Sequence, residues 1–111
     1  MRAITYVMPS RPPPLSGRLS PESVVVAARD NLASDLPDET IVLNLPRGRY
    51  FGVNGVAREI WRMLQQPVTV RSIADAIVQR YDAPVAEVER DVFAFLDELR
   101  SNELITVSAP A

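Results

Sequence analysis

The chain contains no cysteine, no histidine and no lysine among its 111 residues. Without cysteine it can form neither disulfides nor thiolate metal sites, and it has no cysteine nucleophile. Without histidine it also lacks the commonest general base and the ligand on which most zinc, copper and haem sites depend. An enzyme of this composition would have to work with carboxylates, tyrosines or arginines. We therefore predict no catalytic residue, no metal site and no cofactor.

The net charge is −2, and the twelve basic residues, all arginines, are scattered from Arg2 to Arg100. A domain that binds nucleic acid through its phosphates usually gathers its basic residues on one surface, so this pattern does not favour nucleic acid as a partner. No apolar run approaches the roughly 18 to 20 residues of a membrane-spanning helix, and the N-terminus lacks the hydrophobic region of a signal peptide. We expect a cytoplasmic protein that does not bind membranes.

The length suits one domain, and proline marks where we expect it to begin. Residues 4–7 are a short β-prone run, but the proline-rich stretch that follows cannot be helical and favours extended or polyproline II structure. We predict an N-terminal β-prone segment and linker over residues 1–21, a compact domain over 22–107 and a tail over 108–111. A disordered segment without a role is the alternative for the linker.

A β-hairpin is predicted between residues 41 and 53. Apolar residues alternate along 41–45, and a second β-prone run, 49–53, follows after three residues. Pro46 presets φ at the first corner of a turn, and Gly48 tolerates the positive φ that commonly closes such a loop.

An earlier strand is predicted from the apolar residues of 22–28. Residues 31–39 are polar and predict a turn-rich connection into the hairpin. Because the connections are short, we expect these three strands to form an antiparallel meander.

Three amphipathic helices follow, with candidate N-terminal residues Asn54, Thr69 and Pro84. Asn102 is the candidate left-handed cap of the third helix. Residues 104–107 predict either a short final strand or an apolar end that packs on the core. The predicted apolar faces are Val56, Ile60, Met63 and Leu64 with Trp61 beside them, then Val70, Ile73, Ala74, Ile77 and Tyr81, then Val88, Val92, Phe95, Leu96 and Leu99. The fold class predicted from this order is α+β, a winged helix-turn-helix with a three-stranded meander followed by three helices.

Several blocks of the sequence are similar to one protein family. They are Tyr50-Phe51-Gly52-Val53-Asn54-Gly55, Ile60-Trp61-Arg62-Met63-Leu64, residues 70–77, Asp91-Val92-Phe93-Ala94-Phe95-Leu96 and Leu104-Ile105. The chain resembles the PqqD family from about Glu22 to Val107. Val53 stands where the family commonly has leucine, and Glu103 stands where glycine commonly precedes the last leucine, which implies that Asn102 ends the helix instead.

The resemblance implies a protein that binds the leader of a ribosomally made precursor peptide and delivers it to a modifying enzyme. That enzyme would be a radical-SAM enzyme, as in quinone-cofactor synthesis, or a leader peptidase, as in lasso-peptide synthesis. The family's leader lies between the last strand of the meander and the third helix, where it adds as a strand. The peptide-binding residues implied here are Arg49, Tyr50, Phe51, Gly52 and Val53 in the strand and Asp91, Ala94, Phe95 and Glu98 in the helix.

Several of these residues also have a purely structural interpretation. Phe95 lies near the centre of the apolar stripe, which favours the core. Asp91 and Glu98 share one helix face and could meet a basic leader residue or form a solvated flank. Tyr50 and Phe51 point to opposite sheet faces, and the sequence does not say which faces the helices. Gly52 would let a peptide backbone approach closely or would mark a β-bulge.

The first residues raise a separate hypothesis, because Tyr6-Val7-Met8-Pro9 resembles a Tyr-x-x-Pro element of lasso leaders. The segment could occupy the protein's own groove or that of a neighbour, giving a homodimer, or it could pair as an extra strand.

Two other functions compete with leader binding. Winged helix-turn-helix domains commonly bind DNA, but acidic residues outnumber arginines in the third helix, which phosphates would repel. An adaptor that binds a protein partner and no peptide is the third hypothesis. Glu87, Glu89 and Asp91 do not converge on one point and so do not predict a cation site.

Overall fold

The computed structural model describes residues 19–46 and 48–108. The predicted N-terminal strand, most of the predicted linker and the last three residues of the tail lie outside the described residues. The elements in chain order are β1 (Val24–Ala27), β2 (Asn31–Asp35), β3 (Thr40–Asn44), β4 (Arg49–Val53), α1 (Gly55–Met63), β5 (Val68–Thr69), α2 (Val70–Tyr81), α3 (Val85–Ser101) and β6 (Ile105–Ser108).

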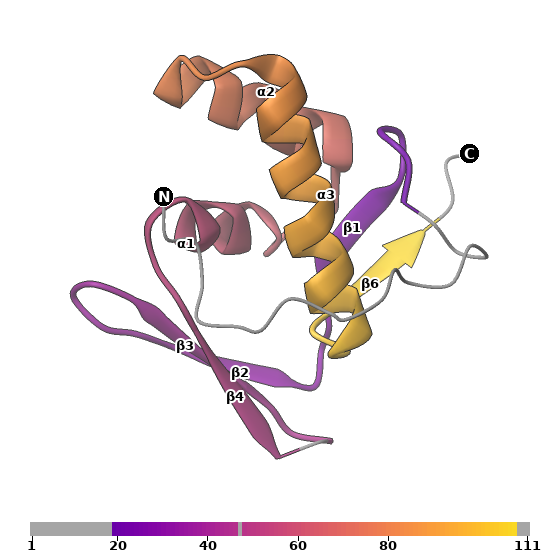
Figure 1. The fold of residues 1–111 in the computed structure, drawn as a ribbon. Coiled ribbons are helices and arrows are strands. Elements are labelled where there is room, and N and C mark those ends of the chain that lie inside the picture. The colour runs from indigo at the N-terminus through magenta and orange to yellow at the C-terminus, as the bar shows by residue number, and fades with distance from the viewer. Residues whose placement is uncertain (1–18, 47, 109–111) are drawn as a thin grey trace.

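The fold is a mixed α+β arrangement in which three helices pack against two small antiparallel sheets. Figure 1 shows the β2–β3–β4 meander below the helices, with β1 and β6 on the right of α3. The strand order is β2-β3-β4 in one sheet and β5-β1-β6 in the other.

The meander begins with a strand that the sequence did not predict. β2 pairs with β3 from Asn31 opposite Asn44 to Asp35 opposite Thr40, and β3 continues the ladder with β4. The prediction that residues 22–28 form the first strand of the meander was therefore wrong. β2 was missed because four of its five residues are exposed, so main-chain bonds to β3 hold it and no buried alternation marks it.

β1 instead forms the centre of the second sheet. It pairs with β5 on one side, Val24 opposite Thr69, and with β6 on the other, Val25 opposite Val107. Main-chain bonds extend the contacts at its end, where Ala27 N donates to Leu64 O at 2.7 Å. The final strand, β6, confirms one of the two predictions for residues 104–107.

The ends of the helices match the predictions from the sequence in part. Thr69 Oγ1 accepts a hydrogen bond from Ser72 N at 3.1 Å and caps α2 as predicted. Asn54 occupies the N-cap position of α1 as predicted but makes no side-chain capping hydrogen bond there, and Pro84 directly precedes α3. At the end of α3, however, Asn102 has φ −98° and Glu103 has φ +63°, so the prediction of a left-handed Asn102 was wrong. The left-handed residue is Glu103, the position at which the resemblance led us to expect glycine.

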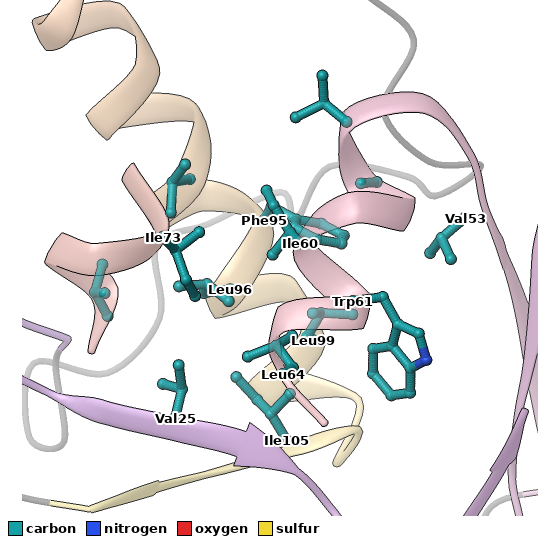
Figure 2. Close-up of a cluster of buried hydrophobic side chains, with 14 of the residues drawn as sticks. Val25, Val53, Ile60, Trp61, Leu64, Ile73, Phe95, Leu96, Leu99 and Ile105 are labelled. Carbon is teal, nitrogen blue, oxygen red and sulfur yellow. The ribbon is translucent and has the colours of Figure 1, made fainter. Parts of the chain in front are cut away.

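The core lies where the helices meet both sheets (Figure 2). Trp61, with 4% of its surface exposed, is part of this core. Phe51, from the meander, packs against the core. The buried helical residues include Ile60 and Leu64 of α1, Ile73 of α2 and Leu96 and Leu99 of α3, and Val25 and Ile105 face them from the second sheet. The helical faces predicted from periodicity are therefore largely confirmed, although Tyr81 is 45% exposed.

Candidate functional site

β4 is an edge strand, which makes its outer side the first candidate for a binding site. It is the last strand in the order β2-β3-β4, and no other described strand pairs with it. Two hydrogen bonds at the ends of the β2–β3 ladder show which residues of each strand bond to which neighbour. Leu36 N donates to Glu39 O at 2.7 Å, and Leu45 N donates to Asp30 O at 3.0 Å.

Bonded and non-bonded pairs alternate along an antiparallel ladder. Residues 41 and 43 therefore turn their main-chain groups toward β2, and residues 40, 42 and 44 turn theirs toward β4. Their partners on β4 are residues 53, 51 and 49. The N–H and C=O groups that point away from the sheet, along the free edge of β4, are those of Tyr50 and Gly52.

The side chains of β4 separate two faces of the meander. Phe51 is half-buried against the core and Val53 is buried, so this face meets the helices. Tyr50 lies on the opposite face with 74% of its surface exposed. The structure thus decides what the sequence left open: Phe51 faces the helices and Tyr50 faces outward.

Gly52 lies in a regular ladder, because Ile41 is its partner and the neighbouring pairs continue without a break. A β-bulge therefore does not explain this glycine. A Cβ atom placed on Gly52 would lie 3.2 Å from Oε2 of Glu39. The absence of a side chain leaves room for the Glu39 carboxylate next to the free edge.

The four predicted residues of α3 differ in how accessible they are. Phe95 is in the core with 3% of its surface exposed, which matches the structural interpretation of this residue. Asp91 is exposed and Ala94 is half-buried. Glu98 is half-buried, and its Oε2 accepts a hydrogen bond from Asn102 Nδ2 at 3.1 Å. Asp91 and Ala94 are thus the members of this set that are best placed to contact a ligand.

A pair of asparagines, the buried Asn44 and the half-buried Asn31, joins the meander to the end of α3. Asn44, with 1% of its surface exposed, donates through Nδ2 to Asn31 Oδ1 at 3.0 Å and to Glu103 O at 3.1 Å. Asn31 Nδ2 in turn donates to Leu104 O at 2.9 Å. Because Asn44 is the partner of Arg49, these bonds fix the start of β4 relative to α3. The sequence signal was a polar residue in the inward phase of a strand, and our sequence analysis missed it.

Arg58 holds the other end of the meander. Its side chain is largely buried and donates to Thr40 Oγ1 at 3.1 Å, to Pro37 O at 3.2 Å and to Leu36 O at 2.7 Å. Its Nη2 atom also lies 3.6 Å from Oδ1 of Asp35. The hydroxyl of Thr40, followed by the charges of Arg58 and Arg62, lowers the pKa of Asp35. This network, also missed from the sequence, ties the β2–β3 turn to the helix that follows β4.

The outer face of the meander carries a row of apolar side chains. Leu32, Leu43 and Tyr50 are direct neighbours across β2, β3 and β4, and we call them the outer row. Leu32 is 59% exposed, Leu43 is half-buried, and no described helix or strand packs on this side of the sheet. Contiguous exposed apolar groups commonly mark interaction sites, so the outer row is a candidate contact surface.

Over residues 19–46 and 48–108, no group of three or more acidic side chains is arranged to hold a metal ion. In the same residues, no helix has the length and apolarity that a membrane span requires.

Comparison with known proteins places this architecture in a family. Residues 39–105 match the family model described as "Coenzyme PQQ synthesis protein D (PqqD)". The chain belongs to the PqqD family. A search of curated protein sequences finds no match.

Two solved structures share the fold. The first, "TbiB1 in Complex with the TbiA(beta) Leader Peptide", is 32% identical with a TM-score of 0.70, and the match covers 76% of this chain and 98% of that one. The second, "Lasso peptide synthetase B1 complexed with the leader peptide", is 18% identical with a TM-score of 0.67 and covers 74% and 96% of the two chains. At that identity the second match supports the fold alone.

Proposed function

We propose that this protein binds the leader of a ribosomally synthesised precursor peptide as a fourth strand beside β4 and delivers it to a modifying enzyme. The observation that carries the proposal is the free edge at Tyr50 and Gly52, whose main-chain groups point away from β3. An extended peptide adds to such an edge through main-chain hydrogen bonds. Membership of the PqqD family and the likeness to TbiB1, solved in complex with a leader peptide, support a leader as the ligand.

Main-chain bonds alone do not account for useful affinity. The four outward groups of Tyr50 and Gly52 contribute about 2 to 6 kcal/mol if each bond is worth roughly 0.5 to 1.5 kcal/mol. Ordering a flexible peptide costs a comparable amount. Contacts with the half-buried Phe51 and Ala94, and with Asp91 for a basic leader residue, would provide the remaining affinity.

The outer row is the surface that we assign to the modifying enzyme. A leader added at β4 extends the same sheet, so an enzyme docked on Leu32, Leu43 and Tyr50 would sit directly beside the bound peptide. An apolar sheet face also suits a stable protein contact. A lasso-type leader peptidase and a PQQ-type radical-SAM enzyme are the two classes of partner that we propose for this surface.

In this function the chain has no catalytic step of its own and works in the cytoplasm. We retain the winged helix-turn-helix interpretation for the meander and three helices, without DNA binding. Five acidic residues and two arginines lie along α3, so a phosphate backbone would meet net negative charge there.

A proline substitution at the free edge tests the proposal. Tyr50→Pro removes an N–H that points away from β3, so it should leave the meander intact while it removes a donor to the leader. Tyr50→Ala is the matched control, because it loses the same side chain and keeps the N–H. With the fluorescently labelled leader of the precursor encoded beside this gene, Tyr50→Pro should bind at least about 2- to 10-fold more weakly than Tyr50→Ala.

Equal affinity of the two variants would show that the leader does not pair with this edge. If the wild type shows no saturable binding below about 100 μM, the adaptor hypothesis would replace leader binding. A salt-dependent shift of duplex DNA would revive the regulator hypothesis.

A further inference from the structure

The charges of this chain are divided unevenly between its first residues and the rest. Residues 1–18 contain Arg2, Arg11 and Arg18 and no acidic residue, a net charge of +3. The remaining residues contain nine arginines and all fourteen acidic residues, a net charge of −5, and the two parts sum to the −2 of the whole chain. A basic segment is thus joined to an acidic domain, and such a division favours contact between them.

The same basic segment contains a run suited to a strand. Residues 3–8, Ala-Ile-Thr-Tyr-Val-Met, combine β-branched and aromatic side chains without a charge, and Pro9 ends the run. We propose that residues 3–8 bind in cis along the free edge of β4 and must be displaced before a leader can bind. The proposal rests on the proposed function for the identity of the competing ligand, whereas contact with the edge can be measured without a leader.

The connection is long enough for this contact. The described domain begins at Leu19, which packs against the core, and its largest extent is 33 Å. The ten residues from Pro9 to Arg18 can span at most about 33 to 36 Å at roughly 3.3 to 3.6 Å per residue. The extended linker is thus comparable in length with the largest dimension of the domain, which permits contact between the segment and β4.

The chemistry of the two partners also agrees. Alternate side chains of a strand point to opposite faces, so Ile4, Tyr6 and Met8 would share one face. On the helix-facing side this set would extend the apolar surface that Phe51 begins. Arg2 would then enter the field of α3, whose exposed acidic residues include Asp91.

A second free edge gives the proposal an internal comparison. β6 is the last strand in the order β5-β1-β6. The hydrogen bond from Ala28 N to Leu104 O, at 2.9 Å, shows which residues of β6 bond to β1. By the same alternation, Ile105 and Val107 point their main-chain groups away from β1. Strand addition at β6 would protect these amides, and strand addition at β4 would protect those of Tyr50 and Gly52.

A tethered competitor has a predictable effect on affinity. A short linker gives an effective concentration in the millimolar range, so a segment with an intrinsic Kd near 0.1 mM would occupy the edge about 10:1. The apparent Kd of a leader would then be about 10-fold higher than its Kd for the unoccupied edge.

The experiment compares the full chain with a variant that lacks residues 1–8 and with an Ile4→Ser, Tyr6→Ser, Met8→Ser variant of full length and unchanged charge. Amide hydrogen exchange without any leader should become faster at Tyr50 and Gly52 in both variants and stay unchanged at Ile105 and Val107. Leader affinity should rise about 10-fold in both, and this gain should disappear in a Tyr50→Pro background.

Unchanged exchange at Tyr50 and Gly52 would overturn the proposal, as would a change at Ile105 and Val107 instead. A dimer of the full chain that becomes monomeric after deletion, measured by light scattering, would place the segment on a second copy and overturn binding in cis. If exchange responds as expected but neither form binds a leader, the contact stands and the proposed function fails.

Discussion

The two sheets of this protein are built in opposite ways. The strands of the β2–β3–β4 meander follow one another in sequence, and the sheet keeps one face and the edge of β4 open among the described residues. In the β5–β1–β6 sheet, β1 pairs with strands that lie some forty and eighty residues further along the chain, and its Val25 is fully buried. The long-range sheet closes the core, and this leaves the local sheet available for binding.

The two regions are nevertheless mechanically joined. Asn44 and Asn31 link the start of the meander to the turn between α3 and β6, and Arg58 links its other end to α1. An edge strand held at both ends loses little freedom when a peptide binds, which favours affinity. The following changes, from the largest expected effect to the smallest, test this division of roles.

The largest effect should come from the sheet that closes the core. Leu104 is buried beside β6, and Leu104→Ala should lower the free energy of unfolding by about 2 to 5 kcal/mol through lost apolar burial and a residual cavity. Urea denaturation measures the loss. Leu32→Ala in the outer row is the control, because a 59% exposed side chain should change stability by less than about 0.5 kcal/mol. Equal losses in the two variants would remove the distinction between the sheets.

A smaller loss is expected where the sheets are joined. Asn44→Ala removes the two part-buried hydrogen bonds that Asn44 donates to Glu103 O and Asn31 Oδ1, which should cost about 1 to 3 kcal/mol. The start of β4 should also become less ordered, so hydrogen exchange at Arg49 should become faster. Full stability of this variant would show that the asparagine pair does not hold the meander in place.

A gain in stability is expected at the end of α3. Glu103 has φ +63°, and a left-handed conformation costs an L-residue roughly 1 to 2 kcal/mol that glycine largely avoids. Glu103→Gly should therefore raise stability by about 1 kcal/mol and increase the Tm. Glu89→Gly, an exposed glutamate inside α3, should instead lower stability by about 0.5 to 1 kcal/mol. A lower Tm for Glu103→Gly would show that the glutamate side chain contributes more than its backbone conformation costs.

The smallest effect should follow from the exposed Asp35. Its pKa is lowered below the ordinary 3.8 by the Thr40 hydroxyl and the charge of Arg58. A carboxylate with a lowered folded-state pKa stabilises the fold above its unfolded value, and this contribution disappears as pH falls through the folded value. The stability difference between wild type and Asp35→Asn should therefore be present near pH 6 and shrink below pH 4. A difference independent of pH would rule out this contribution.

Local patterns in the sequence predicted much of the fold and part of the site. Gly48 adopts φ +63° in the predicted turn, Thr69 caps α2, and the 3.6-residue period identified the buried faces of the helices. The predicted meander also had residues 49–53 as its last strand, and β4 is indeed an edge strand among the described residues. These features depend on residues within a few positions of one another, where backbone preferences act without help from the rest of the chain.

The sequence by itself determined the turn, the helices and the apolar residues of the core. Only the tertiary structure decided that 31–35, rather than 22–28, completes the meander, that Phe51 faces inward and Tyr50 outward, and that Glu103 takes the left-handed conformation. The physical reason is that strand pairing and burial are set by partners far along the chain. An exposed strand such as β2 has little apolar pattern of its own, and a valine-rich strand such as β1 can pair with any suitable edge until the whole core has formed.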